Sequence, residues 1–353
     1  MPFRNEDDLV RWLQRRWPDR ATNVRLGIGD DAAIVSVTRG SEFALTTDLS
    51  IEGVHFRRDL HPPRAVGHRA LARALSDLAA VGARPRFALV SLAFPPATRR
   101  SWVSGFYDGA GVLARRHGVA LIGGDTAVAE GGGIVVDVVA AGEVKRGLAL
   151  RRDGARPGDL LYVTGRLGMA ALGLEMLKSN ARRASTTNRR AEGGGIVRQA
   201  LGAHLYPEPR LGTGRYLAAH RLASAAIDVS DGFARDLGRL CAASACAAIV
   251  REESLPLPRS GTLLTSSTGR PRQQTVREAR LDPLELALRG GEDYELIFTV
   301  PRPRAGRLPR SIKGVALHQI GEIRRGRGLR LLLRSGSEVR LAPRGYDHFR
   351  RAR

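Results

Sequence analysis

The sequence contains few cysteines and no long hydrophobic run. Its 353 residues include two cysteines, Cys241 and Cys246, which are too few for a disulfide framework and lack the spacing of zinc ligands. No uncharged apolar run approaches the length of a membrane span, and the acidic start of the chain has no apolar signal core. We therefore expect a cytoplasmic protein that contacts no membrane.

Lysine and aromatic residues are also scarce, although the net charge is +22. Arginine supplies nearly all of the positive charge, and two basic stretches stand out, residues 179–198 and 324–353. Neither stretch interleaves aromatic residues at base-stacking intervals, and neither matches a nucleic-acid module. We interpret most arginines as solvated surface residues and expect no specific nucleic-acid partner. The alternative, a catalytically idle nucleic-acid binder, predicts an affinity that falls steeply with salt.

The usual nucleotide-binding and hydrolase motifs are missing. No lysine stands in a Walker-type glycine loop, and the dinucleotide fingerprint fails because Asp30, Asp31 and Ala32 follow Gly27-x-Gly29. The sequence contains no H-E-x-x-H, no G-x-S-x-G and no kinase-like H-R-D or D-F-G. Any nucleotide chemistry must therefore depend on other residues.

The length predicts about two domains. Hydrophobic periodicity predicts alternating helices and strands in both halves, and a turn-rich segment at residues 151–159 suggests the boundary. We expect an N-terminal domain over residues 1–147 and a C-terminal α/β domain over residues 148–353. The second would carry loop insertions near residues 179–198 and 258–276.

Aspartates stand where apolar runs meet Gly, Ser or Thr. They are Asp30, Asp31, Asp48, Asp125, Asp228 and Asp231. A strand end beside small residues would place a carboxylate at the rim of a sheet, where α/β proteins bind ligands. Carboxylate and hydroxyl oxygens are ligands that suit Mg²⁺.

Most of these aspartates, taken alone, have a simpler explanation, but Asp228 inside the run AIDVS has none. Most could be turn formers, and Asp231 could cap the helix that follows it. Asp77 is harder to explain, because a carboxylate near a helix C-terminus is disfavoured by roughly 0.3–1 kcal/mol. Strand alternation would send Thr46 and Asp48 to one face. Together these positions favour a site where several carboxylates bind a cation, which in a basic protein points to phosphate chemistry.

Nine ordered motifs then make the chain recognisable. They are GIGDDAAIV (27–35), TTDLSIEGVHF (46–56), LSDLAAVGARP (75–85), LIGGDT (121–126), YVTGRLG (162–168), AIDVSDGFARDLG (226–238), GGEDYELIF (290–298), IGEI (320–323) and GYDHF (345–349). In this order they resemble the thiamine-monophosphate kinase family of the aminoimidazole-ribonucleotide-synthetase-like superfamily. The resemblance implies a two-domain α/β (α+β) fold, whose N-terminal strands form a dimer-spanning barrel and whose C-terminal domain is α/β. It also implies transfer of the γ-phosphoryl group of ATP to thiamine phosphate, giving thiamine diphosphate and ADP.

The resemblance also assigns roles to residues of this sequence. Positions for Mg²⁺ are Asp31, Thr46, Thr47, Asp48, Asp77, Asp125, Asp228 and Asp231, with Asp30 as a possible assistant. Positions near ATP are Tyr107, Gly124, Asp125, Arg152 and Ser230. Positions that hold thiamine phosphate are His55, Glu292 and Tyr346. No general base is expected, because the acceptor phosphate is already anionic. The resemblance also implies a homodimer.

Some positions depart from the family pattern. Ala74 stands where asparagine is frequent, Met169 stands where an acidic residue is frequent, and the Arg-rich segment at residues 179–198 is unusual. Within the superfamily, a selenophosphate synthetase or a hydrogenase-maturation enzyme remains a rival interpretation. Both normally need a reactive residue near one end of the chain, whereas Cys241 and Cys246 lie inside it.

Overall fold

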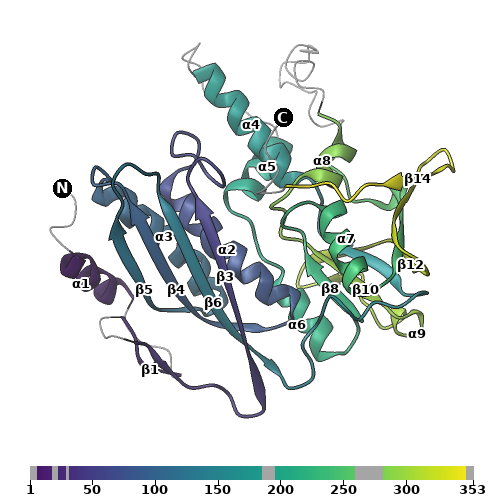
Figure 1. The fold of residues 1–353 in the computed structure, drawn as a ribbon, viewed down its shortest axis with the longest axis horizontal. Coiled ribbons are helices and arrows are strands. Elements are labelled where there is room, and N and C mark those ends of the chain that lie inside the picture. Colours follow the sequence, from purple (N-terminus) through teal and green to yellow (C-terminus); the bar gives the residue numbers. More distant parts are fainter. Residues whose placement is uncertain (1–5, 18–22, 29–31, 185–194, 259–280, 347–353) are drawn as a thin grey trace. The chain divides into compact units, whose positions relative to one another are not determined.

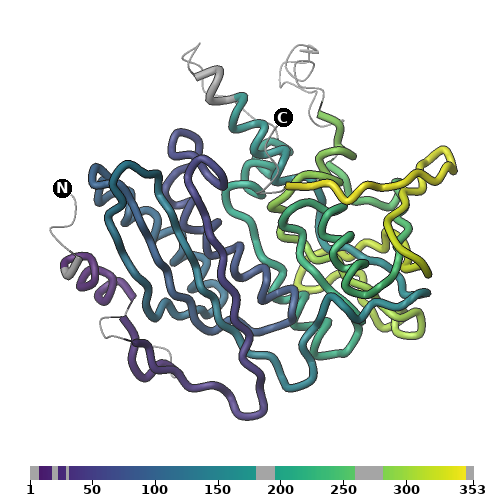
Figure 2. Tube along the Cα trace, viewed as in Figure 1, coloured from purple at the N-terminus to yellow at the C-terminus, as the bar shows by residue number. Residues whose placement is uncertain are grey.

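The computed structural model divides into two compact units. It describes residues 6–17, 23–28, 32–184, 195–258 and 281–346, drawn in colour in Figure 2. Unit 1 comprises residues 1–78 and 83–149, and unit 2 comprises residues 79–82 and 150–353. None of the helices in the described residues is long and apolar enough to cross a membrane.

Unit 1 is built on a four-stranded sheet with strand order β3-β6-β4-β5. The strands are β3 (Ser41–Ile51), β6 (Val135–Lys145), β4 (Arg84–Phe94) and β5 (Ala120–Val128). Only the β4–β5 pair is parallel. Helices α2 (Pro63–Ala80) and α3 (Arg100–His117) cover one face (Figure 1). They approach closely because Gly67 and Gly109 carry no side chain: a Cβ on either would lie 1.9 Å from a carbonyl oxygen of the other helix.

The opposite face of this sheet is only partly covered. Strands β1 (Val24–Leu26) and β2 (Ile34–Val35) contribute Val24 and Val35, which pack near Phe87 at one end of the face. Helix α1 (Glu6–Arg16) lies beside α3, where Trp12 meets Tyr107 edge-on. Farther along the strands the face stays open, and Leu45 is 66% exposed. Part of this sheet face, including Leu45, is therefore exposed in unit 1.

Unit 2 is built on a larger, mostly antiparallel sheet with the path β14-β13-β9-β12-β7-β10-β8, and β11 pairs with β12. Its strands are β7 (Leu160–Thr164), β8 (Ala225–Asp228), β9 (Ala247–Arg251), β10 (Leu296–Val300), β11 (Ser311–Ile312), β12 (Val315–Arg324), β13 (Gly328–Leu332) and β14 (Glu338–Leu341). Its helices are α4 (Met169–Ala184), α5 (Gly195–Leu205), α6 (Leu211–Ala219), α7 (Phe233–Ala243), the 3-10 turn Glu252–Ser254, α8 (Pro283–Arg289) and α9 (Arg302–Ala305). Its main core includes Phe233, Leu237 and Leu240 from α7 and Ile227 and Ile297 from the sheet.

Two sequence expectations are corrected. Gly123, Gly124 and Asp125 predict a turn from the sequence alone, and this prediction is wrong, because β5 runs through all three residues. Gly124 has φ +151°, and a Cβ there would lie 1.9 Å from the Val90 carbonyl oxygen, so only glycine fits this approach. The loop expected at residues 179–198 is helical at both described ends, where α4 continues to Ala184 and α5 begins at Gly195. Residues 185–194 and almost all of the expected loop 258–276 lie outside the described residues.

Candidate functional site

Three predicted residues of unit 1 gather on the helix-covered side of the sheet. Thr46 and Asp48 are two residues apart on β3, so their side chains leave the same face. The Thr46 hydroxyl donates to Asp77 Oδ2 at 2.5 Å. Asp77 lies in the last turn of α2, so the tertiary fold brings it to the strand from 31 positions away.

Asp48 is a carboxylate in an unfavourable setting. Its pKa is raised from 3.8 to about 6, mainly by burial; Arg73 lowers the pKa, and the nearby carboxylates Asp77 and Asp137 raise it. Arg73 Nη2 lies 3.5 Å from Asp48 Oδ1. A charged Asp48 therefore costs stability in this place, and a bound cation would offset that cost.

A second group lies on the open face of the same sheet. The Thr47 hydroxyl donates to Asp137 Oδ1 at 2.6 Å. Asp137 on β6 lies opposite Ser91 on β4, and Ser91 lies opposite Asp125 on β5. Directly opposed residues share a face, so Asp125, Ser91, Asp137 and Thr47 point to the same side. Sequence reasoning missed Asp137, although an acidic residue within the apolar run VVDVVAA was a signal.

The sheet register keeps Asp48 and Asp125 apart within one chain. They lie on the two edge strands, three strand spacings from each other, which is about 14 Å of sheet. Among the described residues no group of three His, Cys, Asp or Glu side chains could hold a metal ion. Asp30 and Asp31 lie outside the described residues. The oxygen-only donors still fit Mg²⁺, which is commonly bound by one or two carboxylates together with water and substrate phosphates.

Tyr107 and His55 are the remaining described candidates of unit 1. The Tyr107 hydroxyl is hydrogen-bonded to Thr126, the neighbour of Asp125, and burial raises the pKa of Tyr107 well above its usual range. The Ile51 N–H donates to His55 Nδ1 at 3.0 Å. The neutral His55 ring therefore carries its proton on Nε2, where it can donate to an anion.

Four predicted residues of unit 2 are held together by backbone hydrogen bonds. The Glu292 N–H donates to the Ser230 carbonyl at 2.8 Å, and the Tyr346 N–H donates to the Asp231 carbonyl at 2.9 Å. Glu292 has φ +65°, a left-handed conformation that costs energy outside glycine. Asp228 ends β8 just before this turn and is buried. Segments far apart in the sequence thus meet around one turn.

Arg152 does not join this group. Its carbonyl accepts from the Ser244 hydroxyl at 2.7 Å, beyond the C-terminal end of α7. The turn with Ser230 and Asp231 precedes the other end of this helix, whose eleven residues span about 16 Å. The expected role of Arg152 near ATP stays a prediction.

Asp236 organises the turn, and sequence reasoning missed it. Its Oδ2 accepts from the N–H groups of Ser230, Asp231 and Gly232 at 3.0, 2.9 and 3.1 Å. Arg239 links the two carboxylates, at 2.7 Å from Asp236 Oδ1 and 2.6 Å from Asp231 Oδ2. The Asp236 side chain, on α7, is completely buried. A signal existed, since Asp236 falls on the apolar face of its predicted helix.

Comparison with known proteins identifies the family. The chain matches the model of the AIR synthase related protein N-terminal domain over residues 29–144 and that of the C-terminal domain over residues 156–334. It is 37% identical to the thiamine-monophosphate kinase of Escherichia coli strain K12 over 343 residues, 97% of each chain. The chain belongs to the thiamine-monophosphate kinase family. Its expected two-domain fold is confirmed.

Solved structures of the thiamine-monophosphate kinase family share this fold. The enzyme from Stenotrophomonas maltophilia K279a superposes with a TM-score of 0.74 at 36% identity, covering 92% of this chain and 94% of that one. AaThiL complexed with AMPPCP and TMP superposes with a TM-score of 0.72 at 30% identity, covering 98% and 97%. Both alignments include nearly all of both units.

Asp236 supports a testable prediction for this family member. Asp236→Ala leaves three N–H groups of the turn without their acceptor and Arg239 with Asp231 alone, so we expect the free energy of unfolding to fall by about 3 kcal/mol. Urea unfolding measures the change. Glu285→Ala, which removes an exposed ion pair with Arg289, is the matched control and should cost about 0.5 kcal/mol or less. Equal losses in the two variants would contradict the role of Asp236.

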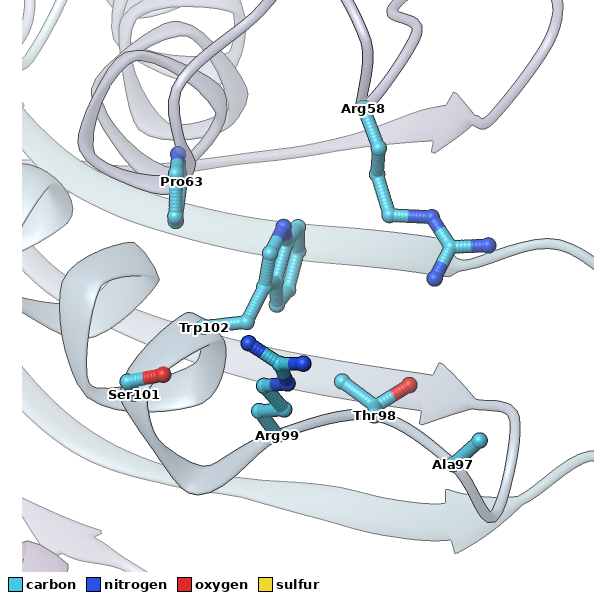
Figure 3. Close-up of a pocket in the computed structure, with 7 residues that line it drawn as sticks. All are labelled: Arg58, Pro63, Ala97, Thr98, Arg99, Ser101 and Trp102. Atoms are coloured by element: carbon cyan, nitrogen blue, oxygen red, sulfur yellow. The ribbon is translucent and has the colours of Figure 1, made fainter.

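A pocket of about 460 Å³ lies elsewhere in unit 1, between the segment after β3 and the start of α3 (Figure 3). It is lined by Arg58, Pro63, Ala97, Thr98, Arg99, Ser101 and Trp102. The lining contains two arginines and no carboxylate, so this pocket is not the cation site predicted by the aspartates.

Proposed function

We propose that this chain transfers the γ-phosphoryl group of ATP to thiamine phosphate, giving ADP and thiamine diphosphate. The observation that carries the proposal is the near full-length similarity to thiamine-monophosphate kinases at 33–37% identity in Escherichia coli and Bacillus subtilis. The related AaThiL was solved with AMPPCP, an ATP analogue, and TMP. The gathered carboxylates and hydroxyls of unit 1 supply the oxygen donors that such chemistry needs.

The residue roles follow the family pattern. For Mg²⁺ we propose Asp31, Thr46, Thr47, Asp48, Asp77, Asp125, Asp228 and Asp231. For ATP we propose Tyr107, Gly124, Asp125, Arg152 and Ser230, and for thiamine phosphate His55, Glu292 and Tyr346. We assign residues 1–147 to the domain that binds ATP and Mg²⁺.

The mechanism needs positioning more than proton transfer. When bound, Mg²⁺ would neutralise charge on the phosphates of donor and acceptor. Asp48 and Asp77 supply carboxylate oxygens for it, and Thr46 orients Asp77. The Nε2–H of His55 can donate to the acceptor phosphate. No side chain has to deprotonate the acceptor, because a phosphate monoester is already anionic near neutral pH.

We also propose a homodimer closed through the open face of unit 1. The edge strands β3 and β5 each pair with one neighbour in the described residues, and free edges invite pairing with another chain. Phe43, Leu45 and Leu49 are exposed, and by strand alternation they share this face. Joining β3 to the β5 of a second copy would cover the exposed part of this face and place the Thr47–Asp48 segment beside the strand that carries the partner's Asp125.

An ADP-release assay tests the proposed reaction. The full chain with ATP and Mg²⁺ should release ADP in proportion to thiamine phosphate, and thiamine diphosphate should accumulate in equal amount. Thiamine, which lacks the acceptor phosphate, and an unrelated phosphate monoester are the controls. ADP release that does not depend on the acceptor, or no release with thiamine phosphate, would overturn the proposal.

A further inference from the structure

Arg73 places a positive charge among the carboxylates of unit 1. It lies on α2 one turn before Asp77, so both side chains leave the same side of the helix. Its guanidinium contacts Asp48 on β3, and both side chains are largely buried, with 17% and 23% exposed. The contact therefore links Arg73, which the aspartate pattern did not include, with Asp48, a predicted ligand of Mg²⁺.

Asp48 lies among three other charged groups. Arg73 lowers the pKa of Asp48 while Asp77 and Asp137 raise it, and the distance from Arg73 Nη2 to Asp48 Oδ1 is 3.5 Å. The surface pair Arg57–Asp59 in the same unit is tighter, with two hydrogen bonds at 3.0 and 2.5 Å. A loose pair between a buried guanidinium and a crowded carboxylate can exchange its cation at little cost in hydrogen bonding.

Unit 2 contains a comparable arrangement. Arg239 lies 2.6 Å from Asp231 Oδ2, and Asp231 is another predicted ligand of Mg²⁺. In each unit an arginine therefore neutralises a carboxylate that the proposed function gives to a divalent ion. This repetition argues against an accidental contact at Asp48.

We propose that Arg73 is an internal counter-cation that competes with the divalent ion for Asp48. It holds Asp48 in the metal-free chain, and its charge raises the Mg²⁺ concentration at which the ion enters. Arg73 is thus a positioning residue that sets the metal requirement. The inference rests on the proposed function in one respect, the role of Asp48 as a ligand.

Removal of this charge should strengthen Mg²⁺ binding. A guanidinium within a few ångströms of Asp48 repels a divalent ion in a partly buried site, where charges are poorly screened. We call the Mg²⁺ concentration that gives half of the maximal rise in Tm the Mg²⁺ midpoint. For Arg73→Leu we expect this midpoint to fall about tenfold. Arg73→Lys keeps the charge and should stay close to the wild type. Arg73→Gln also removes the charge and should behave like Arg73→Leu. It replaces Arg73→Leu in the experiment if the leucine variant does not fold.

The experiment is a thermal-unfolding titration with MgCl₂, without ATP or thiamine phosphate. Arg64→Leu is the matched control: it removes the same charge from an exposed position on α2, nine residues or about 13 Å away. The Mg²⁺ midpoint of Arg64→Leu should stay within about twofold of the wild-type value. In an Asp48→Asn background, Arg73→Leu should no longer shift the midpoint, because the contested carboxylate is gone.

The outcomes separate this inference from the proposed function. An unchanged or higher midpoint in both Arg73→Leu and Arg73→Gln, or no Mg²⁺ response in the wild type, overturns the role of Arg73. A shifted midpoint in a chain that does not phosphorylate thiamine phosphate overturns the proposed reaction and leaves the counter-cation in place. Normal kinase activity with no midpoint shift overturns only the counter-cation.

Discussion

Asp48→Asn is expected to lower kcat by about a thousandfold, the scale on which a charged group aimed at the reacting phosphates contributes. The reason is the loss of a carboxylate that we assign to Mg²⁺, beside Thr46 and Asp77. Steady-state ADP release at saturating ATP measures the effect. Asp59→Asn, which removes a carboxylate paired with Arg57 on the surface of the same unit, is the matched control and should retain near-normal turnover. A kcat within tenfold of the wild type in Asp48→Asn would remove Asp48 from the mechanism.

The same variant should not be less stable in the absence of Mg²⁺. Asp48 has a folded pKa of about 6 against an ordinary 3.8, because burial disfavours its charge. Between these values the folded chain holds more protons than the unfolded chain, so the wild-type free energy of unfolding falls as pH rises through this window. Asparagine is never charged and should lack this contribution. A Tm clearly below the wild type at pH 7.5 in EDTA would contradict this account and make the kcat loss a folding defect.

Helices were predictable where their burial pattern is local. The sequence predicts helices over residues 63–81 and 233–243, and the structure places α2 and α7 there. Short strands were less predictable, since β9 is a five-residue run whose strand state depends on pairing with β12 and β13. The G-G-D turn was wrong because the fit of Gly124 against Val90 depends on the neighbouring strand.

The site shows the same division between local and non-local information. Strand alternation alone put Thr46 and Asp48 on one face, because both lie on one strand. The pairing of Asp137 with Thr47 could not be assigned from the sequence, since it depends on the register of β3 against β6. The separation of Asp48 from Asp125 likewise depends on the strand order.

The arginines show the limit of composition. We interpreted most of them as solvated surface residues, yet Arg210 makes two hydrogen bonds of 2.6 Å with the buried carboxylate of Glu295. Arg73 and Arg239 contact carboxylates at the two candidate groups. A net charge gives the sum of these residues and says nothing about which of them meet an acid, because those meetings are tertiary contacts.

The position of Asp48 and Asp125 on opposite sheet edges leads to a prediction about mixed dimers. If β3 of one subunit meets β5 of the other, each site takes Asp48 from one chain and Asp125 from its partner. A dimer of one Asp48→Asn chain and one Asp125→Asn chain would then contain one site with both substitutions and one site with neither. Each variant alone should be nearly inactive. An equimolar mixture, unfolded and refolded together, should regain about a quarter of the wild-type activity, because half of the dimers are mixed and each has one intact site.

The control mixture combines Asp48→Asn with Asp77→Asn. Thr46 donates to Asp77 within one chain, and Asp48 lies on the same strand as Thr46, so these two substitutions damage the same half-site. In a mixed dimer of this kind each site carries one substitution, and activity should stay at the level of the single variants. Recovery in the Asp48–Asp125 mixture but not in the Asp48–Asp77 mixture requires a site shared between subunits. No recovery in either, with refolded wild type fully active, would show that Asp48 and Asp125 act within one chain and that the sheet must bend to bring its edges together.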